Sequence, residues 1–290
     1  MEYSSDKMQE KLHMTRHPGI DPPPFVTRIG GIEGENVHLE SSYCYPRGGG
    51  QPGDTGSIES ERGECTDFGE VLPGEMLLHP VENPDLFEVG ASVTCSIDVD
   101  RRNGHALMHT AQHIVSALAE DMWGAETVGN QLTVGASRVD LLFEDKALFD
   151  PDELVSATNS IISSELTVDV HEWERSRILG HEQMRHTKFM HRIPSSITHL
   201  RVVEISGVDL CPCAGTHVSN TSMIPPIRFI GKKNKGKGRI RFSYEFEEQD
   251  NQVTIKWWAR QELNLRSSPC QGDVITPRPR ALGIRTDAAT

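Results

Sequence analysis

The chain of 290 residues lacks any long hydrophobic run. A helix that crosses a lipid bilayer needs about 20 consecutive apolar residues, and no segment of this sequence approaches that length. The segment 1–20 is polar and of mixed charge, and it lacks the apolar stretch of a secretory signal peptide. These absences predict a protein with no membrane partner, and the expected compartment is the cytoplasm.

Positive charge is also in short supply, because 29 Lys and Arg stand against 42 Asp and Glu, a net charge of −13. Such an acidic surface argues against indiscriminate binding of nucleic acid. The segment 227–242 runs against this trend, since it carries basic residues and no acidic one. Its basic residues are Arg228, Lys232, Lys233, Lys235, Lys237, Arg239 and Arg241. The patch favours an anionic partner that touches one edge of the protein, and the alternative is a solvated hairpin tip.

The pattern of apolar residues divides the chain into four segments. Residues 1–20 are predicted to be a flexible leader, and the three prolines that follow close off any helix. Residues 21–95 carry short alternating runs broken by Gly, Pro and Asp, which predicts a small N-terminal β-barrel or sandwich. Residues 96–248 mix helical and strand patterns and predict an α+β domain. Residues 249–290 show no periodicity, which predicts a disordered tail.

Periodicity also predicts the individual elements. One helix is expected over 105–123, where apolar residues recur on a single stripe. A second is expected over 150–166, where an aspartate caps the helix and a proline opens its first turn. A third is expected over 174–185. The expected strands cover 25–29, 36–40, 91–95, 139–143, 166–172, 200–205, 227–230 and 239–246.

Two segments far apart in the sequence supply soft or borderline metal ligands. His109 and His113 are spaced i and i+4, so they share one face of the predicted helix, and Cys213 and His217 have the same spacing. One thiolate with three imidazoles is a suitable ligand set for zinc. The six cysteines are scattered rather than paired, which in a reducing compartment favours thiols or metal ligands over a disulfide framework. The sequence therefore predicts one metal site that joins distant parts of one domain.

Several alternatives stay open at this stage. His105 with His109 forms a competing pair, and Cys211 offers a second thiol beside Cys213. The zincin peptidase motif is excluded, because Thr110 stands where that motif needs a glutamate. Four protein ligands can also close the tetrahedron of a purely structural site.

A glycine-rich segment is the third signal. Gly48, Gly49 and Gly50 are consecutive, which lets the backbone approach a ligand closely and expose its N–H groups. Gln51 follows them and adds an amide that both donates and accepts hydrogen bonds. The segment fits neither common nucleotide-binding fingerprint, because it has no following Lys-Ser/Thr and no G-x-G-x-x-G spacing.

Together the three motifs resemble the AlaX family, free-standing relatives of the editing domain of alanyl-tRNA synthetase. The likeness runs from about residue 25 to residue 246. It rests on Gly-Gly-Gly-Gln at 48–51, on His-Thr-Ala-Gln-His at 109–113, and on Cys-Ala-Gly-Thr-His-Val at 213–218 with Asn-Thr at 220–221. The related editing domain of threonyl-tRNA synthetase shares the histidine and cysteine elements but lacks the glycine segment. The glycine segment therefore favours the alanine-specific branch.

The resemblance implies both a fold and an activity. The implied fold is α+β, a small N-terminal β-barrel followed by a zinc-containing α/β editing domain like that of alanyl- and threonyl-tRNA synthetases. The implied activity is a zinc-dependent trans-editing hydrolase for translation fidelity, which cleaves the ester of serine, with glycine as a second candidate, from mischarged tRNA(Ala). One Zn²⁺ per chain would be held by His109, His113, Cys213 and His217. No obligatory protein partner is evident.

Three residues are expected to sense the hydroxyl of a misplaced serine: Ser42, Thr110 and Gln112. A site that hydrogen-bonds this hydroxyl rejects an alanyl group, which leaves the partners in the site unpaired. Ser42 stands where the family usually has threonine, and it keeps the hydroxyl. Two other positions depart from the family, since Cys44 replaces a frequent aromatic residue and Ala214 replaces the usual glycine.

Two further contacts are expected with the tRNA. The backbone amides near Gly48–Gly50 are expected to bind the terminal nucleotide or the developing oxyanion, while Asn130 and Gln131 are candidates for a polar pocket. Lys232, Lys233, Lys235 and Lys237 are the expected phosphate contacts. Two other functions compete: editing of Ser-tRNA(Thr), and a non-catalytic zinc-stabilised module that binds RNA or protein.

Overall fold

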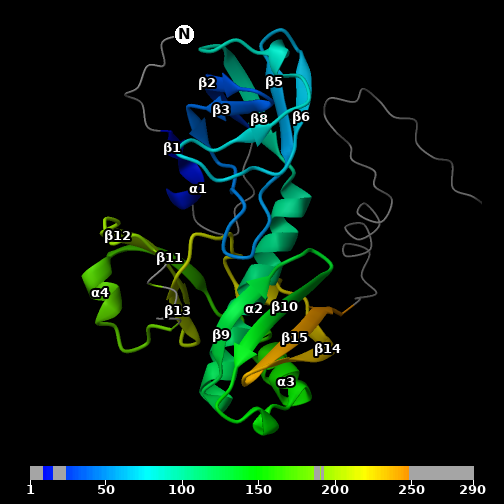
Figure 1. Cartoon of the computed structure of the whole chain (residues 1–290), viewed down its shortest axis with the longest axis vertical. Coiled ribbons are helices and arrows are strands. Elements are labelled where there is room, and N and C mark those ends of the chain that lie inside the picture. The colour runs from blue at the N-terminus through cyan, green and yellow to red at the C-terminus, as the bar shows by residue number, and fades with distance from the viewer. Residues whose placement is uncertain (1–8, 16–23, 186–189, 191–192, 248–290) are drawn as a thin grey trace, which may run out of the picture.

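The computed structural model describes residues 9–15, 24–185, 190 and 193–247. Strands dominate the N-terminal part, coloured blue to cyan in Figure 1. The long helix α2 (Val99–Trp123) leads from this part into a mixed α/β part coloured green to orange. Two large hydrophobic clusters follow the same division, one inside the N-terminal sheet and one around α2.

The N-terminal part is built on a six-stranded antiparallel sheet with the strand order β6-β5-β8-β2-β3-β7. Burial alternates along β2, as expected where one face of a strand packs on a core. An isolated bridge between Phe68 and Val81 brings the two edges of the sheet together. The closed barrel expected for residues 21–95 stays a prediction. The strands are β2 Phe25–Glu33, β3 Asn36–Leu39, β5 Gly56–Ser60, β6 Cys65–Phe68, β7 His79–Pro80 and β8 Ser92–Ile97.

Residues 9–15 pack on this sheet, whereas the sequence predicts a flexible leader over 1–20. The short strand β1 (Glu10–Lys11) pairs in parallel with β4 (Ser41–Ser42), and one helical turn, α1 (Leu12–Thr15), follows. The buried Gln9 amide donates to Leu39 O at 2.6 Å and accepts from Leu77 N at 2.8 Å. These bonds fix the described segment to the sheet through main-chain groups.

Helix α2 is longer and more buried than its apolar stripe predicts. It begins after Asp98, whose carboxylate accepts from Arg101 N, and it ends at Gly124, which has a φ of +62°. His109 and His113 are only 3% and 4% exposed, so burial extends beyond the apolar stripe of the helix. The polar face of the helix that carries these two histidines is therefore covered by other parts of the chain.

The second part holds two sheets. The four-stranded sheet has the order β14-β15-β10-β9 and packs with α2 and α3 around the larger hydrophobic cluster, and the other has the order β11-β12-β13. Figure 1 shows the two sheets on opposite sides of the lower half of α2. The strands are β9 Glu126–Gln131, β10 Ala136–Leu142, β11 Val168–Glu174, β12 His199–Ile205, β13 Asp209–Pro212, β14 Ile227–Gly236 and β15 Arg239–Phe246. The helices are α3 Pro151–Ile162 and α4 Arg175–Leu179, with 3₁₀ turns at Lys146–Leu148 and Thr221–Met223; another 3₁₀ turn, Pro84–Leu86, lies in the N-terminal part.

Several predicted boundaries change. The helix expected over 174–185 is only five residues long, because it ends at Gly180. The helix expected over 150–166 ends at Ile162, and its N-cap is Asp150 as predicted. The mixed α and β character agrees with the predicted class, and the predicted tail at 249–290 lies outside the described residues. In the part of the chain that the structure describes, every helix is too short or too polar to cross a membrane.

Candidate metal centre

The four residues expected to bind metal come together at the middle of α2. The ligand atoms of His109, His113, Cys213 and His217 all lie within 4.8 Å of one another. The Cys213 Sγ atom is 3.6 Å from His109 Nε2 and 3.3 Å from His217 Nε2. His105 lies outside this cluster, and Cys211 belongs to a second group of potential ligands together with His113 and Asp209, so the choice of ligands stays a prediction.

The local sequence explains how the cluster assembles. Helix α2 presents His109 and His113 one turn apart, and the loop that follows β13 brings Cys213 and His217 against them. Gly215 allows this approach, because a Cβ atom there would clash with the imidazole of His109. The Thr110 hydroxyl accepts from Val218 N at 3.2 Å and so fastens the loop to the helix.

Each imidazole in the cluster is held through its Nδ1 atom by a different neighbour. The three contacts are His109 Nδ1 with Gln51 Oε1 at 2.8 Å, His113 Nδ1 with Asp209 Oδ2 at 2.8 Å, and His217 Nδ1 with Thr110 Oγ1 at 3.2 Å. Metal-binding histidines are oriented in this way, with one ring nitrogen fixed by a neighbour and the other free for the ion. The pattern supports a metal centre more strongly than the residue types alone.

The electrostatics of the cluster favour one anion among the imidazoles. Burial by itself raises the pKa of the Cys213 thiol, but His109, His217 and His113 outweigh that effect and bring the pKa well below its ordinary value. Burial lowers the pKa of His109, and it lowers the pKa of His217 to about 3. These directions describe a thiolate beside two neutral imidazoles, those of His109 and His217, which is the form in which these groups bind metal.

His113 differs from the other two histidines. Burial lowers its pKa, but the Cys211 and Cys213 sulfurs and the Asp209 carboxylate raise it well above the usual value. Cys211 Sγ lies 3.4 Å from both His113 Nδ1 and Asp209 Oδ2, which makes a second group of potential ligands. The 2.8 Å contact between His113 and Asp209 is the length of a charge-assisted hydrogen bond, so we interpret this group as support for His113.

The donor set fits a tetrahedral ion. Bond lengths of about 2.0–2.3 Å in a tetrahedron place sulfur and nitrogen donors roughly 3.5 Å apart. The distances of 3.3 and 3.6 Å from Cys213 Sγ to the two Nε2 atoms bracket this value. These two distances match a tetrahedral site, and the four side chains could hold a metal ion.

The glycine-rich segment lies against the same cluster. Gly48 and Gln51 exchange backbone hydrogen bonds of 3.0 and 2.8 Å, which closes a tight turn. Gly50 has a φ of +85°, and a Cβ atom there would clash with the Asn130 side chain. Its carbonyl accepts from Leu132 N at 2.9 Å. The glycines thus let the turn sit directly on the second part of the molecule.

Two of the three predicted hydroxyl-sensing residues are engaged within the protein. The Thr110 hydroxyl contacts His217 and can donate to Ala106 O at 2.9 Å, which places it behind the cluster. Ser42 is fully buried in the N-terminal part, where its Oγ accepts from Cys44 N and lies 3.3 Å from His79 Nε2. Neither position provides an open hydroxyl that faces the cluster.

Gln112 belongs to a polar network beside the histidines. Its amide donates to Ser116 Oγ at 2.8 Å and accepts from Asn130 Nδ2 at 3.0 Å. Ser116 also accepts from Thr127 Oγ1 at 2.7 Å. Asn130 therefore joins Gln112 to the glycine-rich turn, while the exposed Gln131 accepts from Arg138 and takes no part in this network.

Sequence reasoning missed two residues at the centre, Asp209 and Arg201. Arg201 is 9% exposed, and its Nη1 donates to Cys213 O at 2.7 Å and Gly215 O at 2.9 Å. It therefore shapes the loop that carries two of the clustered side chains. Asp209 lies four residues before Cys213, but its bond to a histidine 96 residues away leaves no local pattern.

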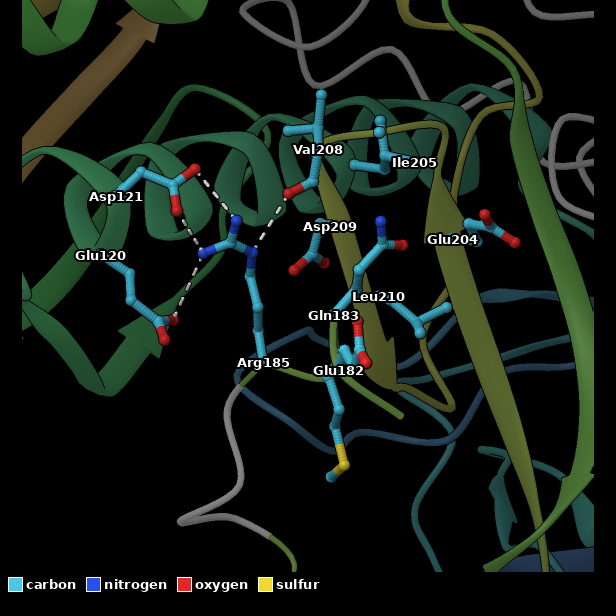
Figure 2. Close-up of a pocket in the computed structure, with 12 residues that line it drawn as sticks. Glu120, Asp121, Glu182, Gln183, Arg185, Glu204, Ile205, Val208, Asp209 and Leu210 are labelled. Atoms are coloured by element: carbon cyan, nitrogen blue, oxygen red, sulfur yellow. Dashed lines mark hydrogen bonds and ion pairs between the residues drawn. The ribbon is translucent and has the colours of Figure 1, made fainter. Parts of the chain in front are cut away.

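A polar cavity of about 340 Å³ is lined in part by Asp209. Figure 2 shows Arg185 in its wall, joined to Asp121, Glu120 and the carbonyl of Val208. Asp209 itself is 3% exposed, and it both lines this cavity and contacts His113.

The predicted phosphate contacts lie on the hairpin of β14 and β15. Lys232, Lys233, Lys235 and Lys237 are all exposed. Among the described residues, none forms an ion pair with these four lysines, whereas Arg228 and Arg241 pair with Glu245 and Asp140. Their charges are therefore available to a partner.

The fold and the cluster define a class of protein, the tRNA-synthetase editing modules. The family model described as threonyl and alanyl tRNA synthetase second additional domain matches residues 200–243. The chain is 35% identical over 222 residues to the alanyl-tRNA editing protein AlaX-M of Saccharolobus solfataricus, covering 76% of this chain and 92% of the relative. It is 33% identical to AlaX-M of Methanosarcina mazei, covering 75% and 89%. The chain belongs to the AlaX family of alanyl-tRNA editing proteins.

The likeness also extends to full synthetases. The alanine–tRNA ligase of Pyrococcus abyssi is 29% identical over 253 residues, which cover 84% of this chain but only 26% of the ligase. The present chain thus corresponds to one section of that enzyme.

Proposed function

We propose that this protein is a trans-editing hydrolase that releases serine from mischarged tRNA(Ala), with glycine as a second candidate. The observation that carries the proposal is the cluster of one thiolate and three imidazoles, each imidazole fixed through Nδ1, beside the glycine-rich turn. The names of the AlaX-M relatives support an editing reaction on alanyl-tRNA.

We further propose that the cluster holds one Zn²⁺ per chain through His109, His113, Cys213 and His217. A bound zinc ion would supply Lewis-acid polarisation of a substrate oxygen. The protein's part is to keep the three Nε2 atoms and the thiolate aimed at one point before the ion arrives. Gln51, Asp209 and Thr110 do this through the hydrogen bonds described above.

The reaction itself is acyl transfer to water. Water adds to the ester carbonyl carbon, the bond to the ribose oxygen breaks, and that oxygen takes up a proton, which leaves free serine and intact tRNA. We propose that backbone amides of the turn at Gly48–Gly50 contact the terminal nucleotide or the developing oxyanion. The Gly48 amide is already bonded to Gln51 O, so Gly49 and Gly50 are the better candidates.

The choice of serine over alanine is proposed to depend on the network of Gln112 and Asn130. Amides fixed by Ser116 and by each other offer a hydrogen bond to a serine hydroxyl at little entropic cost. An alanyl group would leave such a partner unsatisfied. Ser42 remains a weaker candidate that would need its contact with His79 to open. Thr110 is not carried into the proposal, because its hydroxyl supports His217.

We propose the arrangement of the whole molecule in the same terms. Residues 21–95 form the small N-terminal β-barrel, and the bridge between Phe68 and Val81 supports its closure. Residues 96–248 form the editing domain. The exposed lysines of the β14–β15 hairpin contact tRNA phosphates, since they form no ion pair with any of the described residues.

The test is deacylation of Ser-tRNA(Ala), with Ala-tRNA(Ala) and Ser-tRNA(Thr) beside it, by zinc-loaded wild type and a folded Cys213→Ala variant. We expect fast loss of serine from tRNA(Ala) alone, and a loss of activity in the variant. Gln112→Ala should lower the serine rate while zinc content stays the same. Survival of all three esters with zinc bound would favour the non-catalytic binding module, and loss of Ser-tRNA(Thr) alone would favour threonyl-type editing.

A further inference from the structure

We propose that Gln51 is a positioning residue of the metal centre, through which the glycine-rich turn sets the geometry of both ligand-bearing segments. The inference rests on the proposed metal role of the cluster. The role proposed for Gln51, the last residue of the glycine motif, is to orient a metal ligand, and this differs from contact with the terminal nucleotide.

The Gln51 amide is used completely and is almost sealed from solvent, with 1% exposure. Its Oε1 lies 2.8 Å from His109 Nδ1 and accepts from Thr216 N at 3.1 Å. Its Nε2 donates to Thr216 Oγ1 at 2.8 Å. The Gln51 side chain therefore contacts both helix α2, which carries two of the proposed ligands, and the loop after β13, which carries the other two.

These contacts determine the tautomer of His109. A backbone N–H can only donate, so the amide atom that faces Thr216 N must be the Gln51 oxygen. The same oxygen faces His109 Nδ1, which must then carry the proton. The lone pair of His109 is left on Nε2, the atom that faces Cys213 Sγ at 3.6 Å. Gln51 thus holds His109 in its metal-binding form and orientation.

Gln51 can orient His109 because its own backbone lies in a turn, Gly48–Gln51, that is held in place by several contacts. Its backbone exchanges two hydrogen bonds with Gly48, and the Tyr45 hydroxyl donates to Gly48 O at 2.9 Å. Gly50 fits tightly against Asn130. The turn cannot shift without disturbing these contacts, so the position of His109 depends on the glycine-rich turn.

If Gln51 orients His109, Gln51→Glu should bind zinc more tightly than Gln51→Met. If Gln51 only fills space, the order of the two affinities should be reversed. Gln51→Glu keeps an oxygen that accepts from His109 Nδ1–H and Thr216 N–H, and the Thr216 hydroxyl can rotate to donate to the second oxygen. Gln51→Met keeps the volume but removes every hydrogen bond. An orienting residue tolerates Glu and fails with Met, whereas a packing residue tolerates Met and fails with a buried charge.

The measurement is zinc affinity of the full chain by chelator competition, with the visible spectrum of the Co²⁺-loaded protein as a second readout. We expect Gln51→Glu to bind zinc within about threefold of wild type, and Gln51→Met to bind it about 10–100-fold more weakly with an altered cobalt spectrum. Gln131→Ala is the matched control, because this glutamine contacts neither His109 nor Thr216, and its zinc affinity should equal that of wild type. Should Gln51→Met fail to fold, Gln51→Asn, which is too short to reach His109, takes its place with the same expected loss.

Wild-type affinity in Gln51→Met, or a loss confined to Gln51→Glu, would overturn the inference. Because affinity is read without tRNA, the result is independent of the proposed reaction. A wild type that binds zinc but leaves Ser-tRNA(Ala) intact would remove the proposed function and leave the role of Gln51 standing. A wild type that binds neither metal would overturn the inference itself.

Discussion

Gly215 has no side chain, and this absence allows the loop that carries Cys213 and His217 to approach the candidate metal centre closely. The loop from Cys213 to His217 passes so close to helix α2 that a Cβ atom at Gly215 would clash with the His109 ring and lie 3.1 Å from Gln51 Oε1. The neighbouring Ala214 is exposed, so the departure from the family glycine at that position costs the centre nothing that the structure reveals. Sequence alone gives these two small residues no such difference.

Gly215→Ala is therefore expected to displace the His109 imidazole. Zinc affinity should fall at least about tenfold, because the ring loses both its orientation and its bond to Gln51. Ala214→Ser adds a group of similar size at the exposed neighbour and should leave affinity unchanged. Chelator competition on the two purified variants gives the comparison. Equal affinities would mean that the loop yields easily and that the tight approach has no bearing on the metal.

The spacing of His109 and His113 has a direct geometric meaning, because one helical turn separates them on α2. Cys213 and His217 lie in a loop, so only their residue types and their motif pointed to them. The structure brings the four together, and zinc binding by them stays a prediction. Asp209, Arg201 and the bond from Gln51 to His109 could not be predicted, because each joins segments far apart in the chain. Ser42 and Thr110 carry the expected hydroxyls, but tertiary contacts occupy both.

Among the elements, α2 shows what periodicity misses. Its apolar stripe predicts a start near residue 105, while the helix begins at Val99 because Asp98 caps it. Arg102, in the added turn, is buried and bonds to the Asp54 carboxylate and to Tyr43 O at 2.8 Å. That turn therefore anchors the helix, and the histidines on it, to the N-terminal sheet.

The β14–β15 hairpin allows a test of tRNA binding. Replacing Lys232, Lys233, Lys235 and Lys237 with Gln removes four exposed charges and no described ion pair. Binding of tRNA should weaken, and the slope of log affinity against log salt should become shallower by about 0.7–0.9 for each phosphate that is no longer neutralised. Lys146→Gln, at an exposed lysine on another element, should leave the slope unchanged. An unchanged slope in the fourfold variant would mean that these lysines do not contact tRNA phosphates and that the hairpin is only a solvated tip.

The whole molecule is joined at the cluster. The N-terminal turn, the middle of α2 and the loop after β13 meet there through Gln51 and the four clustered side chains. A metal ion at this point would cross-link segments separated by more than a hundred residues, so ion binding and folding should be coupled. The α+β class was predictable from the mixture of periodicities, but this meeting point is a property of tertiary packing.

The central claim is that this cluster is the zinc site of an editing enzyme. The most direct test is titration of metal-free protein with zinc while the initial rate of Ser-tRNA(Ala) deacylation is followed. We expect the rate to rise linearly and to break at one zinc per chain, with Ala-tRNA(Ala) stable throughout. A rate that does not depend on zinc, or zinc saturation without any loss of serine, would contradict the claim.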